Sequence, residues 1–592
     1  MAEVLISPGV LARENDQSQI TAGPVQAGAA IIGPTVKGQN EIPKLITSYS
    51  EYLASFGSTF LSGSNEYTYF TSISAYNYFQ NGGSTLLVTR VTSASVSPAT
   101  SSYIITGSDR NAATADRTSP FVLETIGDGA IYNSGLGDDS SPSGTNGTLG
   151  SGSADNYRWE ITTPNTSSGT FGVLIRQGND TNSSKQVIET YPNVSLDPLA
   201  TNYIARVIGD QTQVLRGAGT SDPYLQTTGS FPNASRFVRV KEVGLQTPNY
   251  LDNDGNARNE FTASIPAAGS GSFGSATGGV GFINAGDTPQ KPQNYYDAIN
   301  NTNQQGLDGS DYTDAINLLA NRDEFRYNVI TAPGLILDNA STGAGWTSIQ
   351  SNCENRGDAI FVGDLSNYNS SITQVGSTAA SVDSSYVATY WPWLMVSDPD
   401  SRQLVWVCAS TMIPGVYAYN DRAGEPWFAP AGINRGGLGA VRQAERKLTN
   451  ANRDTLYQAK VNPIATFPGT GIVVFGQKTL QTKASALDRV NVRRLLITLK
   501  NYISQIADTL VFEQNTAATR NTFLSQVNPY LESVQQRQGL YAFKVVMDNS
   551  NNTPDVIDRN ELIGAVYLQP TKTAEFIYLD FNILPTGATF PA

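Results

Sequence analysis

The chain has 592 residues and a formal net charge of −13, with only 15% charged residues. This length is enough for several domains, each with its own hydrophobic core. The acidic balance argues against nucleic-acid binding through bulk charge. Histidine is absent, which excludes Ser-His-Asp and Cys-His catalysis and metal sites ligated by histidine.

The first residues lack the basic and apolar regions of an export signal, and no apolar run reaches the ~18 residues of a membrane span. We therefore expect a soluble chain without an export signal or a membrane partner. The two cysteines, Cys353 and Cys408, lie far apart beside apolar runs. This placement favours buried thiols over a disulfide framework.

Residues 1–20 contain a short apolar piece at Val4, Leu5 and Ile6, followed by Ser-Pro-Gly-Val and a polar run. No partner strand follows nearby in the sequence. We expect an N-terminal arm, and a disordered terminus is the alternative.

Residues 21–91 alternate between strand and helix patterns. The predicted elements are a strand at Ala29–Gly33, a helix capped by Ser48 and Glu51, an aromatic-rich helix at Tyr67–Gln80 and a strand at Thr85–Val91. The alternation resumes in residues 321–430, with buried strands expected at Tyr327–Gly334, Ala359–Gly363 and Leu404–Ala409. Residues 21–91 and 321–430 together therefore predict one α/β core domain with a parallel sheet.

Between these two segments the sequence is rich in Gly, Ser, Thr and Asn and has little helical periodicity. Strand patterns recur at Tyr157–Thr162, Thr170–Ile175, Val187–Tyr191 and Arg236–Val243. We expect two β-rich insertions, at residues 92–215 and 216–320. The Gly/Ser-rich stretch 267–281 is interpreted as a loop or linker.

From Ala431 onward basic residues outnumber acidic ones, although the whole chain is acidic. Ser485 and Asp488 have the spacing of a helix cap, so a helix should begin there. Its apolar stripe comprises Val492, Leu495, Leu496, Leu499, Tyr502, Ile503, Ile506 and Leu510. Three basic residues, Arg489, Arg493 and Lys500, cluster beside this stripe.

A second helical pattern, broken or restarted at Pro529, ends at Gly539, and a hairpin is expected from Tyr541–Met547 and Leu562–Leu568. We assign residues 431–570 to a C-terminal domain and residues 571–592 to a terminal strand or arm. That strand is apolar on both faces, through Phe576, Ile577, Tyr578, Leu579 and Phe581.

Two stretches imitate ligand-binding motifs. Residues 471–479 look like a phosphate-binding loop, but Gln477 separates the second glycine from Lys478. Residues 252–256 imitate the start of a calcium loop, but Ala257 and Ala263 replace the required Gly and Glu. We predict a strand and a turn there, with no catalytic, cofactor-binding or metal-binding residues, and therefore no enzyme.

Several short segments of the sequence resemble the tail sheath proteins of contractile-tailed bacteriophages, which are related to the sheaths of contractile injection systems. In the last third they are Phe512–Thr516, Asn552–Asp555, Ile557–Asp558, Pro570 and Ala574–Ile577. Earlier in the chain they are Gly33–Gly38, Tyr52–Gly57, Phe79–Gly83, Ala332–Gly334, Tyr390–Trp393, Asp398–Pro399, Ile413–Tyr419 and Trp427–Pro430.

The resemblance implies an α+β multidomain fold. It would comprise an α/β core domain of subtilisin-like topology, a C-terminal α+β sheath domain, β-rich inserted domains and extended terminal arms. It further implies a virion protein, assembled in the host cytoplasm, that polymerises helically around the tail tube and contracts to drive the tube through the host envelope. The implied partners are further copies of the chain, joined by strand exchange through the arms, the tail tube protein, and the baseplate and tail terminator proteins.

We hypothesise that Arg489, Arg493 and Lys500 face an acidic tail tube, and that the two apolar terminal segments are the strands exchanged between subunits. Basic residues that merely border a core are the alternative for the first set. A β-rich virion surface protein or adhesin is the rival function, suggested by the composition of residues 92–320.

Overall fold

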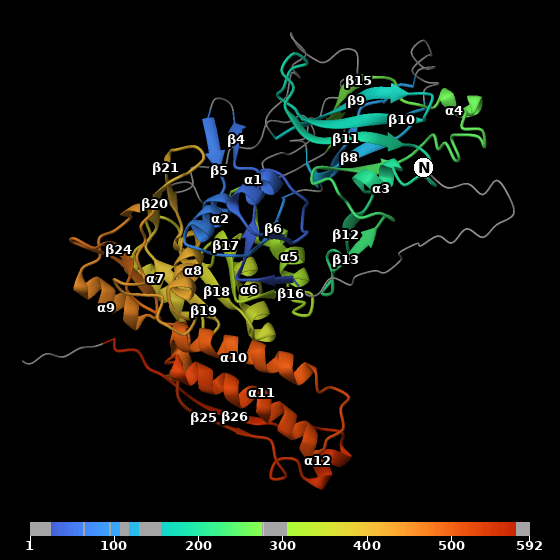
Figure 1. Cartoon of the computed structure of the whole chain (residues 1–592). Helices are drawn as coiled ribbons and strands as arrows, with labels where there is room; N and C mark the ends of the chain where they lie inside the picture. Colours follow the sequence, from blue (N-terminus) through green and yellow to red (C-terminus); the bar gives the residue numbers. More distant parts are fainter. Residues whose placement is uncertain are drawn as a thin grey trace, which may run out of the picture.

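The computed structural model describes residues 25–62, 65–93, 96–106, 118–129, 155–274, 276 and 305–575. Figure 1 shows three regions: a central core domain, an insertion to one side of it, and a C-terminal unit of long helices below it. The predicted arm strands, Val4–Ile6 and Phe576–Phe581, lie outside the described residues.

The core domain is built on an eight-stranded sheet with the order β24-β23-β19-β18-β17-β2-β6-β3. Its strands are β2 (Ala29–Gly33), β3 (Lys44–Ile46), β6 (Leu86–Arg90), β17 (Val329–Ile336), β18 (Ile360–Asp364), β19 (Val387–Trp391), β23 (Asn462–Phe467) and β24 (Gly471–Val474). The inner strands pair in parallel, and only the edge strands β3 and β24 pair antiparallel. The prediction that N-terminal strands complete a parallel sheet is confirmed.

Helices cover both faces of this sheet, which explains why strands such as β2 and β17 are buried at every position. They are α1 (Tyr49–Phe56), α2 (Phe70–Gln80), η5 (Gly309–Tyr312), α5 (Thr313–Leu318), α6 (Gly343–Arg356), α7 (Ile372–Ala380), η6 (Ala409–Thr411), α8 (Ile413–Ala423) and α9 (Asn450–Gln458). The predicted cap of α1 is confirmed, because the Ser48 side chain accepts a hydrogen bond from the Glu51 amide.

Short strands complete the core domain. They are β1 (Val25–Ala27) with β16 (Phe325–Tyr327), β4 (Thr59–Ser62) with β5 (Asn65–Thr68), and β20 (Leu394–Ser397) with β21 (Leu404–Val407) and β22 (Val441–Ala444). The prediction for Leu404–Ala409 was right about the strand and wrong about its sheet, since β21 pairs antiparallel with β20. The expected domain boundary after residue 430 is also wrong, because β23 continues the core sheet beside β19.

The insertion is one module, and not the two that were expected. Its seven-stranded sheet has the order β11-β10-β9-β15-β7-β8-β14 and uses strands from both sides of residue 215. They are β7 (Pro98–Ser101), β8 (Val122–Asp128), β9 (Tyr157–Asn165), β10 (Thr170–Gln177), β11 (Val187–Ser195), β14 (Val238–Glu242) and β15 (Gly269–Gly274). The helices α3 (Ile204–Ile208) and α4 (Asn259–Thr262) and the hairpin of β12 (Thr212–Arg216) and β13 (Tyr224–Thr228) accompany the sheet.

Strand β15 lies inside the stretch that was interpreted as a linker. It pairs with β9 on one side and with β7 on the other. Gly271 lies opposite Trp159, and a Cβ at this glycine would be 2.5 Å from the Trp159 indole. The glycine therefore allows a large side chain to pack against the middle of the sheet.

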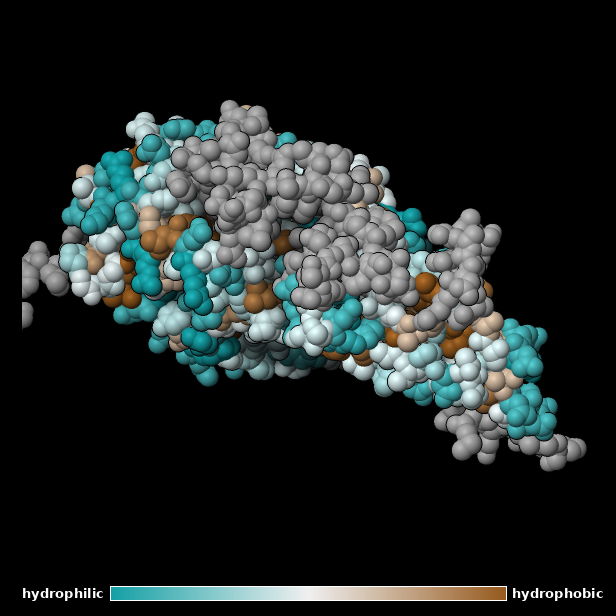
Figure 2. Space-filling model, turned by 90° about the horizontal axis from the view of Figure 1, so that it is seen from above, coloured by the Kyte–Doolittle hydropathy of each residue, from teal (hydrophilic) through white to brown (hydrophobic). Residues whose placement is uncertain are grey.

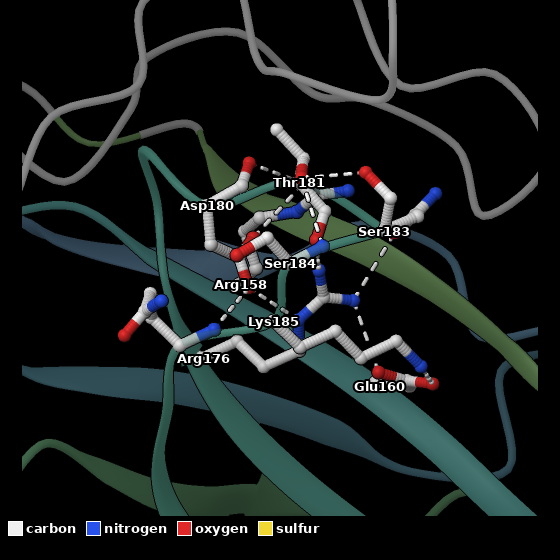
Figure 3. A network of polar contacts seen from close by, with 10 residues as sticks. Arg158, Glu160, Arg176, Asp180, Thr181, Ser183, Ser184 and Lys185 are labelled. Carbon is white, nitrogen blue, oxygen red and sulfur yellow. Dashed lines mark hydrogen bonds and ion pairs between the residues drawn. The ribbon is translucent and has the colours of Figure 1, made fainter.

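Buried charged residues of this sheet pair with one another, as Figure 3 shows. The Arg176 guanidinium donates to both Asp180 oxygens, at 2.7 and 2.9 Å, and to Glu160 at 3.0 Å. Arg158 also donates to Asp180, at 3.2 Å. These pairs fix the turn between β10 and β11 to β9.

Residues 305–320 are not part of the insertion, although the predicted boundary included them. Leu307, Tyr312 and Ile316 pack in the same cluster as Trp346 of α6. The insertion therefore ends before residue 305. Residues 305–320, which we call its return segment, follow the insertion and contribute to the core.

The C-terminal unit contains α10 (Val490–Asp508), α11 (Ala517–Gln536), β25 (Leu540–Val546), α12 (Pro554–Asp558) and β26 (Ala565–Pro570). The predicted stripe packs in its core, with Leu495, Leu499 and Ile506 buried against α11. Tyr502 is half-exposed and stacks on Tyr530.

Two details of these helices differ from the prediction. Ser485 caps a separate 3₁₀ turn, η7 (Ala486–Asp488), and Arg489 is extended, so α10 begins at Val490. Pro529 lies inside α11 without ending it. A capping pattern fixes where a turn begins, but it does not say whether the turn continues as an α-helix.

Cys353 and Cys408 are buried free thiols, as predicted. Among the described residues no helix is both long and apolar enough to cross a membrane. On the face seen in Figure 2, apolar side chains of described residues form scattered patches among hydrophilic ones.

Candidate functional site

The basic residues of α10 mostly contact the chain's own core domain. Arg493 is buried, and its guanidinium lies 4.0 Å from the centre of the Tyr386 ring. It donates to the carbonyl oxygen of Ser385 at 3.2 Å and also to the Ser385 hydroxyl. Burial lowers the pKa of Arg493, and the Tyr386 hydroxyl partly offsets this. The guanidinium therefore docks α10 onto the segment before β19.

Arg494, which the sequence analysis did not single out, has a similar role. Its guanidinium donates to Asp421 of α8 at 2.5 Å and lies over the Tyr417 ring. Both Arg493 and Arg494 are almost fully buried, so consecutive arginines dock the helix on two sides. Nothing in the sequence separated Arg494 from a solvent-exposed arginine, because its acidic partner is 73 residues away.

Lys500 is exposed, and its ammonium lies 3.5 Å from the Tyr386 hydroxyl. The structure therefore brings Arg493 and Lys500 to the same tyrosine. Beyond Lys500, α10 borders an open groove of about 400 Å³ that is lined by Arg322, Arg326 and Tyr502 among others.

Arg489 lies elsewhere, at the junction of η7 and α10, where it binds the last described residue. Its Nε donates to Oε1 of Glu575 at 2.7 Å, and a terminal nitrogen donates to Oε2 at 3.0 Å. Tyr457 of α9 donates to Oε2 at 2.7 Å, and Gln477 donates to Oε1 at 3.0 Å. We call Glu575 with Arg489, Tyr457 and Gln477 the Glu575 clamp.

The clamp holds an ionised carboxylate. Burial alone would raise the pKa of Glu575, but the hydrogen bonds from Arg489, Tyr457 and Gln477 outweigh burial and lower this pKa. For the same reason the pKa of Tyr457 is raised, first by burial and then by its bond to the carboxylate. The bidentate geometry of Arg489 is the strong form of an arginine–carboxylate pair.

The hairpin of β25 and β26 is the second candidate surface. Its inner residues, including Phe543, Val545 and Leu568, pack against the helices. Tyr541 and Tyr567 on its other face are exposed. The hairpin forms a two-stranded sheet within the part of the chain that the structure describes, so each strand has one unpaired edge there.

The two stretches that imitate ligand motifs have the structures predicted for them. Residues 471–474 form strand β24, and residues 252–256 form a turn closed by a hydrogen bond from the Asp252 amide to the Asn256 carbonyl. Among the described residues no group of three or more acidic or cysteine side chains could hold a metal ion.

Two regions of the chain match known protein families. Residues 305–480 match the central domain of phage tail sheath proteins, and residues 482–584 match the phage tail sheath C-terminal domain. The chain therefore contains two adjoining domains of the phage tail sheath family. These matches cover the second half of the core domain and the whole described C-terminal unit.

Curated tail sheath proteins match over part of their length. The tail sheath protein of Vibrio phage KVP40 is 41% identical over 216 residues, which are 36% of this chain and 31% of that protein. The tail sheath protein of Enterobacteria phage T4 is 37% identical over 216 residues, which are 36% of this chain and 32% of that protein. The matched regions therefore span about a third of these curated relatives.

Solved sheath structures align over most of the chain at low identity. The helical sheath of the anti-feeding prophage in its contracted state aligns with 98% of this chain and 99% of that chain, at 15% identity and a TM-score of 0.46. A sheath tail protein from Listeria innocua aligns with 93% of this chain and 96% of that chain, at 11% identity and a TM-score of 0.46.

Proposed function

We propose that this chain is a structural subunit of a contractile phage tail sheath, which polymerises helically around the tail tube and contracts to drive the tube through the host envelope. The observation that carries the proposal is the pair of adjoining sheath domains at residues 305–584. Curated relatives that are tail sheath proteins support it. The subtilisin-like topology of the core domain is part of this proposal.

The work of contraction would come from packing and not from catalysis. A subunit without a catalytic site can do work if it assembles into a metastable lattice that rearranges into a lower-energy one. Open helical polymers arise from head-to-tail contacts between different faces of identical subunits. The chain would then act without a cofactor, as a non-enzymatic protein of the virion that assembles in the host cytoplasm.

Strand addition would keep neighbouring subunits connected while their bodies rotate. The unpaired edges of β25 and β26 are suited to accept an extended segment, because main-chain hydrogen bonds give affinity there without requiring a particular body orientation. The segments around Val4–Ile6 and Phe576–Phe581 are our candidates for the added strands. Each main-chain bond contributes about 0.5–1.5 kcal/mol, so a few per arm suffice for a stable polymer.

The further proposed partners are the tail tube protein, the baseplate and the tail terminator. Lys500 is our candidate for a direct contact with the tube, because its ammonium is exposed. Arg489 and Arg493 would act indirectly, by holding the helix that carries Lys500.

Electron microscopy of the purified full-length chain tests the proposal. We expect hollow cylinders of uniform diameter, alone or after addition of tail tubes. Fibres or discrete trimers would instead support the β-rich virion adhesin, whose basis is the seven-stranded sheet of the insertion. The adhesin gives no reason for the α/β core or for the two sheath domains.

A further inference from the structure

The last described residues cross from the C-terminal unit back to the core domain. After β26, the Thr571 amide donates to the Gly539 carbonyl at 3.2 Å, which is still within the C-terminal unit. Two residues later, the Thr573 hydroxyl accepts a hydrogen bond from Gln477 at 2.6 Å, next to β24 of the core sheet. Glu575 then enters its clamp. The chain is therefore fixed to the core domain immediately before residue 576.

The clamp gathers side chains from separate elements onto one carboxylate. Tyr457 comes from α9, Gln477 follows β24, and Arg489 immediately precedes α10. Because these elements pack in the core domain and at its junction with α10, a force on Glu575 acts on the body and not on the hairpin. Arg489 is in turn paired with Asp488 at 3.0 Å, which orients its guanidinium.

A second arginine–glutamate pair in the same unit shows what an unburied pair looks like. Arg559 and Glu561 are also 3.0 Å apart, but their side chains are 59% and 48% exposed. In the clamp, Arg489 and Glu575 are 24% and 18% exposed. An exposed pair contributes little to holding a chain segment, whereas a partly buried bidentate pair with further hydrogen bonds holds it firmly.

We propose that the Glu575 clamp is the mechanical anchor of the C-terminal segment, through which a second copy of this chain pulls on the core domain when subunits move. The inference rests on the proposed sheath function and names the residues that transmit the load. Glu575 and Arg489 are positioning residues: they fix where the segment leaves the body.

The anchoring step is tested on the unassembled chain. Cys353 and Cys408 are buried and Ala574 is exposed, so Ala574→Cys gives a single reactive site for a spin label. We expect an immobilised spectrum in the otherwise unchanged chain. Glu575→Gln should increase the mobile population about tenfold, because the charge-assisted bonds are lost while the shape of the side chain is kept. Arg489→Gln should act in the same direction.

Two further variants serve as controls. Glu561→Gln removes the carboxylate of the exposed pair and should leave the label immobilised. The double exchange Arg489→Glu with Glu575→Arg should recover part of the immobilised signal, as a direct pair requires. Equal spectra for labelled Ala574→Cys alone and for Ala574→Cys with Glu575→Gln would overturn the clamp. Circular dichroism checks that each variant is folded.

The mechanical step is tested on assembled sheaths. Glu575→Gln chains should form fewer and shorter cylinders than Glu561→Gln chains under identical conditions, because each exchanged segment is no longer fixed to its own body. Cylinders of normal number and length from Glu575→Gln would overturn the mechanical role of the clamp. If the unchanged chain forms no cylinders, the sheath proposal itself fails, whereas the spin-label result still decides whether the anchor exists.

Discussion

Arginines in this chain act as docking residues at the base of the long helix α10, and the difference between them and Lys500 can be measured. Arg493 contacts Ser385 and Tyr386 and is buried, whereas Lys500 reaches the same tyrosine from solvent. A cation of the first kind stabilises the subunit, and one of the second kind is free to meet a partner.

We predict that Arg493→Glu destabilises the isolated subunit and that Lys500→Glu does not. Losing the hydrogen bonds and the aromatic contact of Arg493 should lower the free energy of unfolding by about 1–3 kcal/mol. Lys500→Glu should change it by less than about 0.5 kcal/mol. Urea unfolding of both variants checks this.

The same two variants separate folding from tube binding. If Lys500 contacts an acidic tube, sedimentation with tail tubes should weaken in Lys500→Glu, and in the unchanged chain it should weaken as salt rises. Undiminished sedimentation of Lys500→Glu would return Lys500 to an ordinary solvated residue beside a core.

Glu41 gives the subunit a pH dependence of defined sign. Burial, followed by the charges of Asp314 and Asp311, raises the pKa of Glu41 from 4.5 to about 7. Since the folded chain holds this proton more tightly than the unfolded chain, stability from this group falls as pH rises from 4.5 to about 7 and is then constant. We predict that Glu41→Gln removes this decline. Thermal melting across that range, compared between the two chains, checks it, and parallel curves would contradict it.

At the scale of elements, the sequence patterns identified strands that are apolar at every position and helices that have one apolar face. Strand β2 has the predicted bounds, and the apolar stripe of α10 packs as its spacing predicted. Strand β15 escaped prediction because a Gly/Ser strand has no intrinsic preference for extended structure. Its position is set by pairing with β9 and β7, which no local pattern encodes.

The candidate site was less predictable than the fold, for a related reason. The basic cluster on α10 was visible from spacing, but the partners that decide its role come from distant segments. Glu575 lies 86 residues after Arg489, and Tyr386 lies more than 100 residues before Arg493. Without the tertiary structure, a docking arginine and a solvated lysine have the same pattern.

The β12–β13 hairpin connects the insertion to the core domain. Leu215 and Leu225 pack against the core cluster that contains α5. At the hairpin turn the Gly219 amide donates to Asp314 at 2.8 Å, and Asn317 donates to the Thr220 carbonyl at 3.1 Å. This element therefore helps to fix how the insertion sits on the body.

We predict that Leu215→Ser with Leu225→Ser releases the hairpin from the core. The loss of partly buried apolar surface should cost roughly 2 kcal/mol in total. Hydrogen exchange should show faster exchange of the Gly219 amide, with the protection of β17 and β18 retained. Leu199→Ser, at an exposed leucine of the same insertion, is the matched control. Unchanged exchange at Gly219 would show that the turn contacts alone hold the hairpin.

At the scale of the whole molecule, the insertion interrupts a core domain whose two halves pair directly. Strand β2 from the first half lies between β6 and β17, and none of the described strands of the insertion belongs to this sheet. Polar contacts also cross the junction: Lys37 pairs with Asp155 at 3.0 Å, and Arg90 donates to the Asp128 carbonyl at 2.8 Å. The insertion is thus attached to the core without completing its sheet.

We therefore predict that the insertion can be removed, provided that its return segment stays. Replacing residues 96–304 with a short Gly/Ser linker should give a folded subunit. Among the described residues of that stretch, Leu215 and Leu225 of the hairpin are the ones that contact the two large clusters around the core sheet. Replacing residues 92–320 should fail, because it also removes Leu307, Tyr312 and Ile316 from the core. Each buried side chain of that size contributes about 1.5–3 kcal/mol, so their combined loss approaches the whole stability of a domain.

Cooperative urea unfolding of the first variant and aggregation of the second would support this division. Electron microscopy of the first variant would show whether a sheath can form from the core and C-terminal unit alone. If both variants unfold alike, the polar junction around Arg90 and Lys37 is what the core requires, and the insertion is a structural part of the body.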